Sequence, residues 1–208
     1  MRIKEKFNKK LLVEGNDDQH VIWALCEKFE VIENFDVIDC EGITKLYQQI
    51  PVRFKQSQID TIGLIIDADS EIKDSWKSIG TLLTSQGFTI PESIPLEGLI
   101  LMNSTGFKVG VWIMPNNNEN GMLEDFISFL VPKDDKILPI VNETLTNIEK
   151  KGLNKYSLIH KSKATIHSWL SLQSDPGTPM GLSITKRYLT TEEETCLKLV
   201  NWLKELYK

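Results

Sequence analysis

Leu11-Leu12-Val13-Glu14 and, later in the chain, Ile62-Gly63-Leu64-Ile65-Ile66-Asp67-Ala68-Asp69 are the two stretches that decide the fold. Each is a short apolar run that ends in carboxylates. Such a run is typical of a strand that is buried on both faces of a parallel sheet. The carboxyl ends of parallel strands meet at one edge of the sheet, where α/β folds place their sites. Glu14, Asp67 and Asp69 are therefore expected at one common edge.

The spacing of apolar residues around these runs predicts an alternation of strands and helices. Strands are predicted at residues 10–14, 36–40, 61–67 and 109–114. Helices are predicted between them at residues 18–30, 44–54 and 75–86. Pro51 is expected to end or kink the second helix, and Gly87 to cap the third. This βαβ order predicts an α/β fold of toprim-like, Rossmann-like type, with a mostly parallel sheet flanked by helices.

The rest of the chain is predicted to be a turn-rich excursion followed by helices. Residues 88–108 are rich in Pro and Gly, with a short strand expected at Leu99–Met102, and a helix is predicted from about 121 to 130. Further helices are predicted at 134–150, 160–172 and 191–207, with a Pro/Gly-rich stretch, Asp175–Gly181, before the last. We expect one domain over 1–208, with a core at about 8–130 and a helical C-terminal part at about 131–208.

Composition places the chain among ordinary soluble proteins. Its 208 residues are 41% hydrophobic and 25% charged, and no apolar run is long enough to span a bilayer. The N-terminus is charged and lacks the apolar segment of a secretion signal. Cys26, Cys40 and Cys196 are an odd number at unrelated spacings, which favours reduced thiols over disulfides or a zinc site. We therefore expect a cytoplasmic protein with no membrane contact.

The net charge of −5 is not typical of a general nucleic-acid binder. It does not exclude a protein that binds phosphates through metal ions. Lysines concentrate in residues 4–10 and again in residues 150–163. Such runs are usually solvated faces, with phosphate binding as the alternative.

The Asp67-Ala68-Asp69 step indicates a cation site. In an extended segment alternate residues share a face, so both carboxylates would reach one cation. Burying two like charges is costly without a metal ion or a cationic partner. Carboxylate oxygens are ligands that Mg²⁺ or Mn²⁺ prefers. The alternatives are that Asp69 caps the next helix and that Glu14 only complements a helix dipole.

A third acidic pair, Glu124-Asp125, lies at the start of the helix that is predicted after strand 109–114. It would reach the same sheet edge, although dipole complementation is an equal alternative. His160 and His167 are seven residues apart, which is poor spacing for a metal site. The chain has no P-loop, Gly-x-Gly-x-x-Gly or Gly-x-Ser-x-Gly motif, which argues against P-loop, Rossmann dinucleotide and serine hydrolase sites.

The acid-tipped runs also carry a family resemblance. Leu-Leu-Val-Glu-Gly-Asn-Asp-Asp at 11–18 with Ile-Ile-Asp-Ala-Asp at 65–69 resembles the toprim domains of topoisomerases, primases and overcoming-lysogenization-defect (OLD) nucleases. The stretches at 109–115, 121–125 and 173–181 look like a bacterial and phage family of toprim-like proteins of unknown function.

This resemblance implies roles for five residues. It implies that Glu14 is an acid/base and a possible ligand and that Asp67 and Asp69 are Mg²⁺ ligands. By their order along the chain, Glu124 is the candidate for a further ligand and Lys163 for the downstream catalytic lysine.

We therefore expect a Mg²⁺-dependent (or Mn²⁺-dependent) phosphoryl-transfer enzyme, a nuclease that acts on DNA or RNA, with one or two metal ions. The alternative is a catalytically inactive toprim-like binding module, such as the partner subunit of an ATPase in phage defence. A receiver domain of flavodoxin-like type ranks last, because its lysine ends a late strand whereas Lys163 falls in a predicted helix. The sequence leaves the oligomeric state open.

Overall fold

A five-stranded sheet forms the middle layer of the fold. The computed structural model describes residues 5–208. The strands lie in the order β2-β1-β3-β5-β4; β4 is antiparallel to β5 and the other pairings are parallel. The strands are β1 (Lys9–Val13), β2 (Phe35–Asp39), β3 (Thr61–Asp67), β4 (Leu99–Met102) and β5 (Lys108–Met114).

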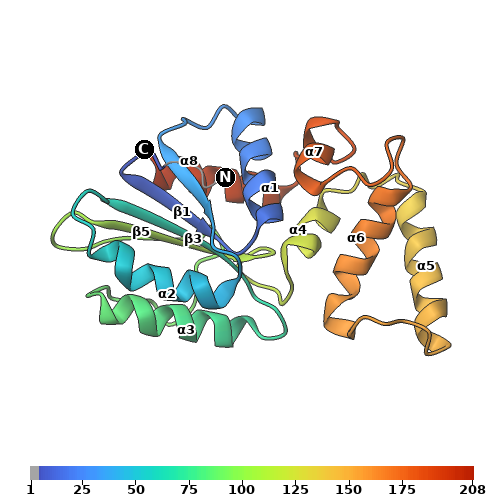
Figure 1. The fold of residues 1–208 in the computed structure, drawn as a ribbon, viewed down its shortest axis with the longest axis horizontal. Coiled ribbons are helices and arrows are strands. Elements are labelled where there is room, and N and C mark those ends of the chain that lie inside the picture. The colour runs from blue at the N-terminus through green and yellow to red at the C-terminus, as the bar shows by residue number, and fades with distance from the viewer. Residues whose placement is uncertain (1–4) are drawn as a thin grey trace.

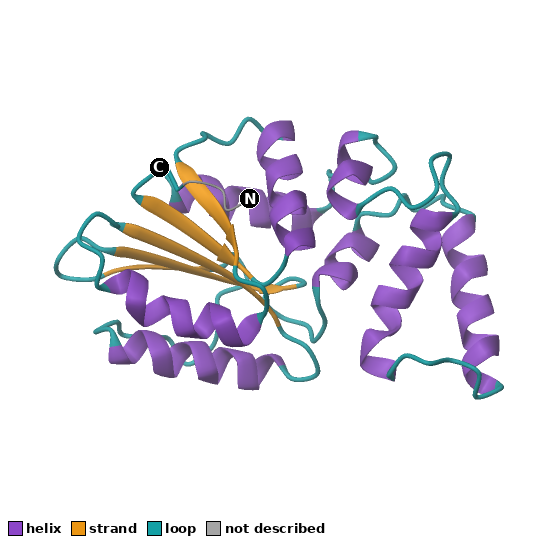
Figure 2. Cartoon of the chain, in the orientation of Figure 1, coloured by secondary structure: helices purple, strands orange, loops and turns teal. Residues whose placement is uncertain are grey.

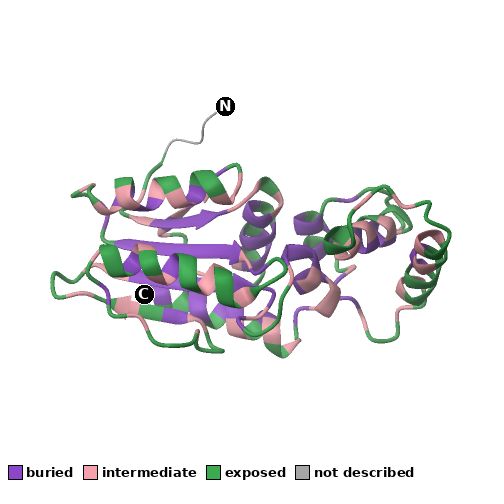
Figure 3. Cartoon of the chain, turned by 90° about the horizontal axis from the view of Figure 1, so that it is seen from below, coloured by how far each residue is buried: buried purple, intermediate pink, exposed green. Residues whose placement is uncertain are grey.

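Helices cover both faces of this sheet (Figure 1). One face packs against α2 and α3, and the other against α1, α4 and α8. The strands are mostly buried, whereas several of the helices around them carry exposed residues on their outer sides (Figure 3). The helices are α1 (Asn16–Lys28), α2 (Ile43–Phe54), α3 (Ile72–Ser85), α4 (Leu123–Phe129), α5 (Ile137–Lys150), the short 3₁₀ helix η1 (Leu158–His160), α6 (Lys161–Ser171), α7 (Met180–Thr185) and α8 (Glu194–Leu206).

The chain reverses its direction across the sheet at β1. From β1 it moves outward to the edge strand β2, and from β2 it returns past β1 to β3. Because α1 and α2 then lie on opposite faces, a crevice is expected between the carboxyl ends of β1 and β3. The arrowheads of the parallel strands converge on the side of the sheet that faces α4 (Figure 2). Two acid-tipped strands therefore end side by side at this position.

The last helix packs directly on the sheet, where two glycines leave room for it. Gly63 of β3 and Gly110 of β5 are neighbours in register. A Cβ atom on Gly63 would lie 2.4 Å from the Tyr207 hydroxyl, and one on Gly110 would lie 2.7 Å from a methyl group of Leu206. The Tyr207 hydroxyl donates a hydrogen bond to the Lys10 carbonyl (2.9 Å). The C-terminal helix thus completes the core of the sheet.

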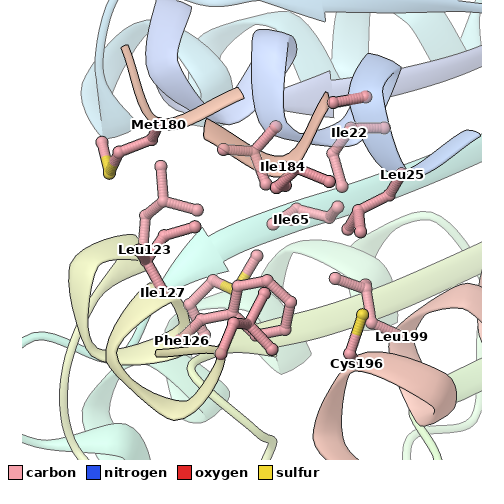
Figure 4. Packing of buried hydrophobic residues seen from close by; sticks show 14 of the residues in the cluster. Ile22, Leu25, Ile65, Leu123, Phe126, Ile127, Met180, Ile184, Cys196 and Leu199 are labelled. Atoms are coloured by element: carbon pink, nitrogen blue, oxygen red, sulfur yellow. The ribbon is translucent and has the colours of Figure 1, made fainter. Parts of the chain in front are cut away.

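The short helix α7 begins at the end of the Pro/Gly-rich stretch, in a part of the chain where no helix is predicted. It packs closely on α1, because a Cβ atom on Gly181 would lie 2.5 Å from the His20 carbonyl oxygen. Met180 and Ile184 of α7 point into an apolar cluster with Ile22 of α1 and side chains of α4 and α8 (Figure 4). The burial of Met180 and Ile184 therefore stabilises a short helix that the sequence pattern does not indicate.

The α/β architecture, the four main strands, the short strand at Leu99–Met102 and the cap at Gly87 are confirmed. Of the two effects expected of Pro51, to end or to kink α2, the first does not occur, because the helix continues to Phe54, where its end was predicted. Its last turn is held by Arg53, which donates two hydrogen bonds of 2.9 Å to Glu5. Within residues 5–208, no helix is long and apolar enough to cross a membrane.

Replacing Gly110 with alanine is expected to destabilise the protein. The new methyl group would overlap Leu206 and Trp202, and overpacking of this kind costs about 1–3 kcal/mol. The matched control is Gly80→Ala in α3, where the nearest atom lies 3.6 Å from the added Cβ; it should stabilise by about 0.5–1 kcal/mol, because alanine is the better helix former. Thermal unfolding of both variants checks this, and equal melting temperatures would contradict it.

Candidate functional site

Glu14 and Asp67 meet at the ends of β1 and β3. The pairing of Leu12 with Leu64 sets this register. The backbone N–H of Asp67 donates a 2.7 Å hydrogen bond to Oε1 of Glu14. The backbone N–H of Leu123, the first residue of α4, donates to Oδ1 of Asp67 (3.1 Å). The carboxyl ends of two strands and the start of α4 are thus joined through two carboxylates.

Asp18 adds a buried carboxylate that the sequence interpretation did not include. It lies in the first turn of α1, is only 7% exposed, and accepts a 3.1 Å hydrogen bond from the Gly15 N–H. The available signal was its position four residues after Glu14, which carries it back over the strand end once a helix begins at Asn16. Gly15 itself has an extended backbone (φ −142°), so a positive φ is not the reason for a glycine here.

Asp69 does not continue the strand. Its φ of +52° is left-handed, so the expectation that the segment stays extended through Asp69 is wrong, although the Asp69 charge still acts on Glu14 and Asp67. Its backbone instead exchanges two hydrogen bonds with Gly121 (2.8 and 2.9 Å). Its side chain caps no helix, because α3 begins after Glu71. A further contact joins the loop after β3 to the loop before α4, because the Asn120 side-chain amide donates a 2.6 Å hydrogen bond to the Ser70 carbonyl.

Glu124 and Lys163 form an ion pair. Lys163, in the first turn of α6, places its Nζ 3.1 Å from Oε1 of Glu124, which is 3% exposed. Nε2 of His167 lies 3.9 Å from the same oxygen. Asp125 serves the start of α4, in line with the helix-dipole alternative, because its carboxylate accepts a 2.8 Å hydrogen bond from the Met122 N–H.

Burial and mutual repulsion make these carboxylates costly to ionise. Burial, opposed in part by the Asp67 N–H and assisted by the Asp69 charge, raises the pKa of Glu14 to about 7. Burial and then the Glu14 charge raise the pKa of Asp18 to about 7. Burial followed by the charges of Asp18, Glu14 and Glu124 raises the pKa of Asp67 well above its ordinary value.

Little positive charge compensates the cluster. The acidic cluster consists of five carboxylates, those of Glu14, Asp18, Asp67, Asp69 and Glu124. Among residues 5–208, the basic side chains within 4.0 Å of these carboxylates are Lys163 and His167, both at Glu124. Burial lowers the pKa of Lys163, but the charge and hydrogen bond of Glu124 with the charges of Asp67 and Asp17 together outweigh it, so its pKa is raised and the ammonium is retained. Burial, with the charges of Glu14 and Asp69, also raises the pKa of the Tyr47 hydroxyl on α2 to about 12. The site therefore holds more acidic groups than basic ones.

The donor set fits a hard divalent cation, since all five groups are carboxylates. In the described part of the chain, however, no three His, Cys, Asp or Glu side chains are arranged to hold a metal ion together. Three of the carboxylates, those of Glu14, Asp18 and Asp67, are turned toward backbone N–H groups. Shared coordination of a cation therefore requires side-chain rotation at the strand ends.

Comparison with known proteins identifies one family model. The model described as Protein of unknown function (DUF3226) matches residues 8–208. None of the curated proteins matches the sequence.

Among solved structures, the chain is similar to the C-terminal region of the Xanthomonas campestris pv. campestris OLD protein. The structure phased with iodine has a TM-score of 0.46 at 11% identity, covering 96% of this chain and 95% of that one. The structure phased with platinum has a TM-score of 0.46 at 10% identity, covering 96% and 93%. The structure phased with mercury has a TM-score of 0.42 at 13% identity, covering 96% and 85%.

Replacing Asp67 with asparagine is expected to stabilise the protein in buffer without divalent cations. The amide keeps an oxygen for the Leu123 N–H but removes a buried charge that repels its neighbours. A gain of roughly 1 kcal/mol corresponds to about 2–4 °C in Tm for a chain of this length.

The matched control is Asp36→Asn at the start of β2. Asp36 is compensated, because Lys10 donates to it at 2.7 Å, so this variant should lose stability. A lower Tm for Asp67→Asn, measured by calorimetry with EDTA, would mean that Asp67 is a structural group and not part of a repulsive cluster.

Proposed function

The chain belongs to the family described as Protein of unknown function (DUF3226), and we propose that it is a metal-dependent phosphoryl-transfer enzyme of toprim type, a nuclease that cleaves DNA or RNA. One observation carries this proposal: carboxylates from two strand ends and two helix starts lie at the switch point of a parallel sheet with little compensating positive charge. The resemblance of residues 11–18 and 65–69 to toprim motifs supports the same conclusion.

Glu14, Asp67, Asp69 and Glu124 are the residues that we propose hold Mg²⁺ or Mn²⁺, and the geometry adds Asp18 as a fifth candidate. A divalent cation at such a site neutralises phosphate charge and lowers the pKa of bound water. The protein contributes a rigid sheet edge that holds oxygen ligands at the ends of β1 and β3. Backbone N–H groups of Gly15, Asp67 and Leu123 hold three of these carboxylates, and these acidic side chains would rotate to coordinate a cation.

In the proposed reaction, the oxygen of water forms a bond to phosphorus and one ester P–O bond breaks. Glu14 is the proposed acceptor of the proton that water releases, because its Oε1 is held by Asp67 while its Oε2 makes no hydrogen bond within residues 5–208. The leaving oxygen takes a proton from solvent. Lys163, which is half exposed, is proposed to turn from Glu124 to the phosphate and balance its developing charge.

The second candidate function is a toprim-like binding module without catalysis, for example a partner subunit of an ATPase. The ion pair of Lys163 with Glu124 favours it, because a lysine then neutralises the position that a metal ion would take. In that case the ammonium stays on Glu124 in the presence of Mg²⁺, and the acidic cluster serves only the fold.

Replacing Glu14 with glutamine, or Asp67 with asparagine, is expected to abolish cleavage of labelled DNA and RNA by the full chain in Mg²⁺ or Mn²⁺. Losses of at least about a hundredfold are expected, because each change removes an oxygen charge at the reacting centre. The same variants should lose the rise in Tm that Mn²⁺ gives to the wild-type protein. Gel assays and thermal unfolding with and without Mn²⁺ measure the two effects.

Glu71→Gln is the matched control, since Glu71 is exposed and its side chain makes no capping hydrogen bond. It should retain both cleavage and the response to Mn²⁺. The nuclease proposal fails if the wild-type protein cleaves neither DNA nor RNA and its Tm does not change when Mn²⁺ is added. Cleavage that survives in the Glu14→Gln protein would place the activity elsewhere.

A further inference from the structure

A lysine-rich helical hairpin lies beside the acidic cluster. Residues 150–163 contain five lysines and no carboxylate, in a chain whose net charge is −5. This stretch joins α5 to α6, which pack side by side beyond α4 at one end of the molecule (Figure 1). Much of that end is exposed (Figure 3).

The turn between the two helices is braced by its own contacts. Glu149 accepts hydrogen bonds from the Lys161 ammonium (2.7 Å) and the Tyr156 hydroxyl (2.9 Å). After α5 the Leu153 N–H donates to the Ile148 carbonyl (3.1 Å). These contacts connect the two ends of the turn, and Lys161 is engaged in them.

Three lysines of the hairpin are left without a partner. Lys150, Lys151 and Lys155 are exposed and have no ion pair with any residue of 5–208. Lys163, in the first turn of α6 directly after this turn, pairs with Glu124 at the acidic cluster. The hairpin therefore carries unpaired lysines at its tip and one lysine that reaches the proposed reaction centre.

We propose that this hairpin binds the phosphate backbone of a nucleic acid and guides it to the acidic cluster. The inference rests on the proposed function, because it uses Lys163 and the acidic cluster as the point to which the strand is led. Ammonium groups that replace counterions on successive phosphates supply affinity without reading sequence. The cluster itself repels a polyanion, so a separate cationic surface is needed to bring one near.

The tip also carries apolar side chains, which fit such a partner. Leu153, Leu158 and Ile159 are 62%, 70% and 42% exposed. Apolar side chains at a nucleic-acid surface contact or wedge between bases. Lysines with exposed apolar residues would also suit an anionic lipid surface. The contact of Lys163 with Glu124 favours the nucleic acid, because it joins the hairpin to the acidic cluster, and binding to a lipid surface would not require that connection.

The test is fluorescence anisotropy of the full chain with a labelled DNA duplex, and with RNA of the same sequence, in EDTA over a series of salt concentrations. The variant Lys150→Gln, Lys151→Gln, Lys155→Gln should bind about tenfold or more weakly, and its slope of log K against log salt should fall by about 3. The matched control removes three exposed lysines from the α2–α3 side, Lys55, Lys73 and Lys77, and should keep the wild-type slope.

Equal losses in both triple variants, or no loss in either, would overturn the inference. It would also be overturned if the hairpin variant lost binding to phosphatidylserine vesicles while its nucleic-acid binding stayed unchanged. A wild-type protein that binds through the hairpin but cleaves nothing with Mn²⁺ refutes the proposed function alone. Cleavage that is unaffected by loss of the hairpin lysines refutes the hairpin inference alone.

Discussion

The parallel pairing of β1 with β3 is the constraint on which the rest of the structure depends. It fixes Leu12 beside Leu64, and the register then brings the Glu14 carboxylate onto the Asp67 N–H. Both strands are buried along most of their length, and the two carboxylates lie at their partly buried ends. The fold therefore keeps these acidic groups near one another, and a cation at this edge is the simplest means of offsetting the cost of ionising them.

The stability that holds these charges together comes from the rest of the sheet. On the α1 side, α8 fills the space above Gly63 and Gly110. The ammonium groups of Lys9 and Lys108, at the amino ends of β1 and β5, donate to carbonyls at the C-terminal end of α8 at 3.1 Å. Lysine at that end of a helix also complements its dipole. The apolar packing and capping that stabilise the sheet are thus separated from the carboxyl edge, where charge repulsion weakens it.

The periodicity of apolar residues was sufficient to predict the sheet and its main helices, because burial on both faces leaves continuous runs such as 61–67. The site was harder to predict from the sequence than the fold. Asp69 left the strand because its backbone pairs with Gly121, a contact between loops distant in sequence. Asp18 was overlooked because an acid in the first helical turn has a local explanation, whereas its burial against Asp67 depends on the tertiary fold. The Lys163–Glu124 contact had no local signal beyond order along the chain.

An acidic net charge is compatible with a proposed nucleic-acid enzyme when its positive and negative charges lie on separate, neighbouring surfaces. A polyanion gains affinity only from the cations that it touches, and screening limits the influence of distant charges to about 10 Å. A net charge of −5 is therefore compatible with binding, provided that the lysines of residues 150–163 face the backbone. Lys163 lies where the two surfaces meet, paired to Glu124 and half exposed. A cation that neutralises the acidic cluster would weaken the ion pair between Lys163 and Glu124 and free the Lys163 ammonium for a phosphate. Cation binding and positioning of the nucleic-acid strand would then be coupled through one side chain.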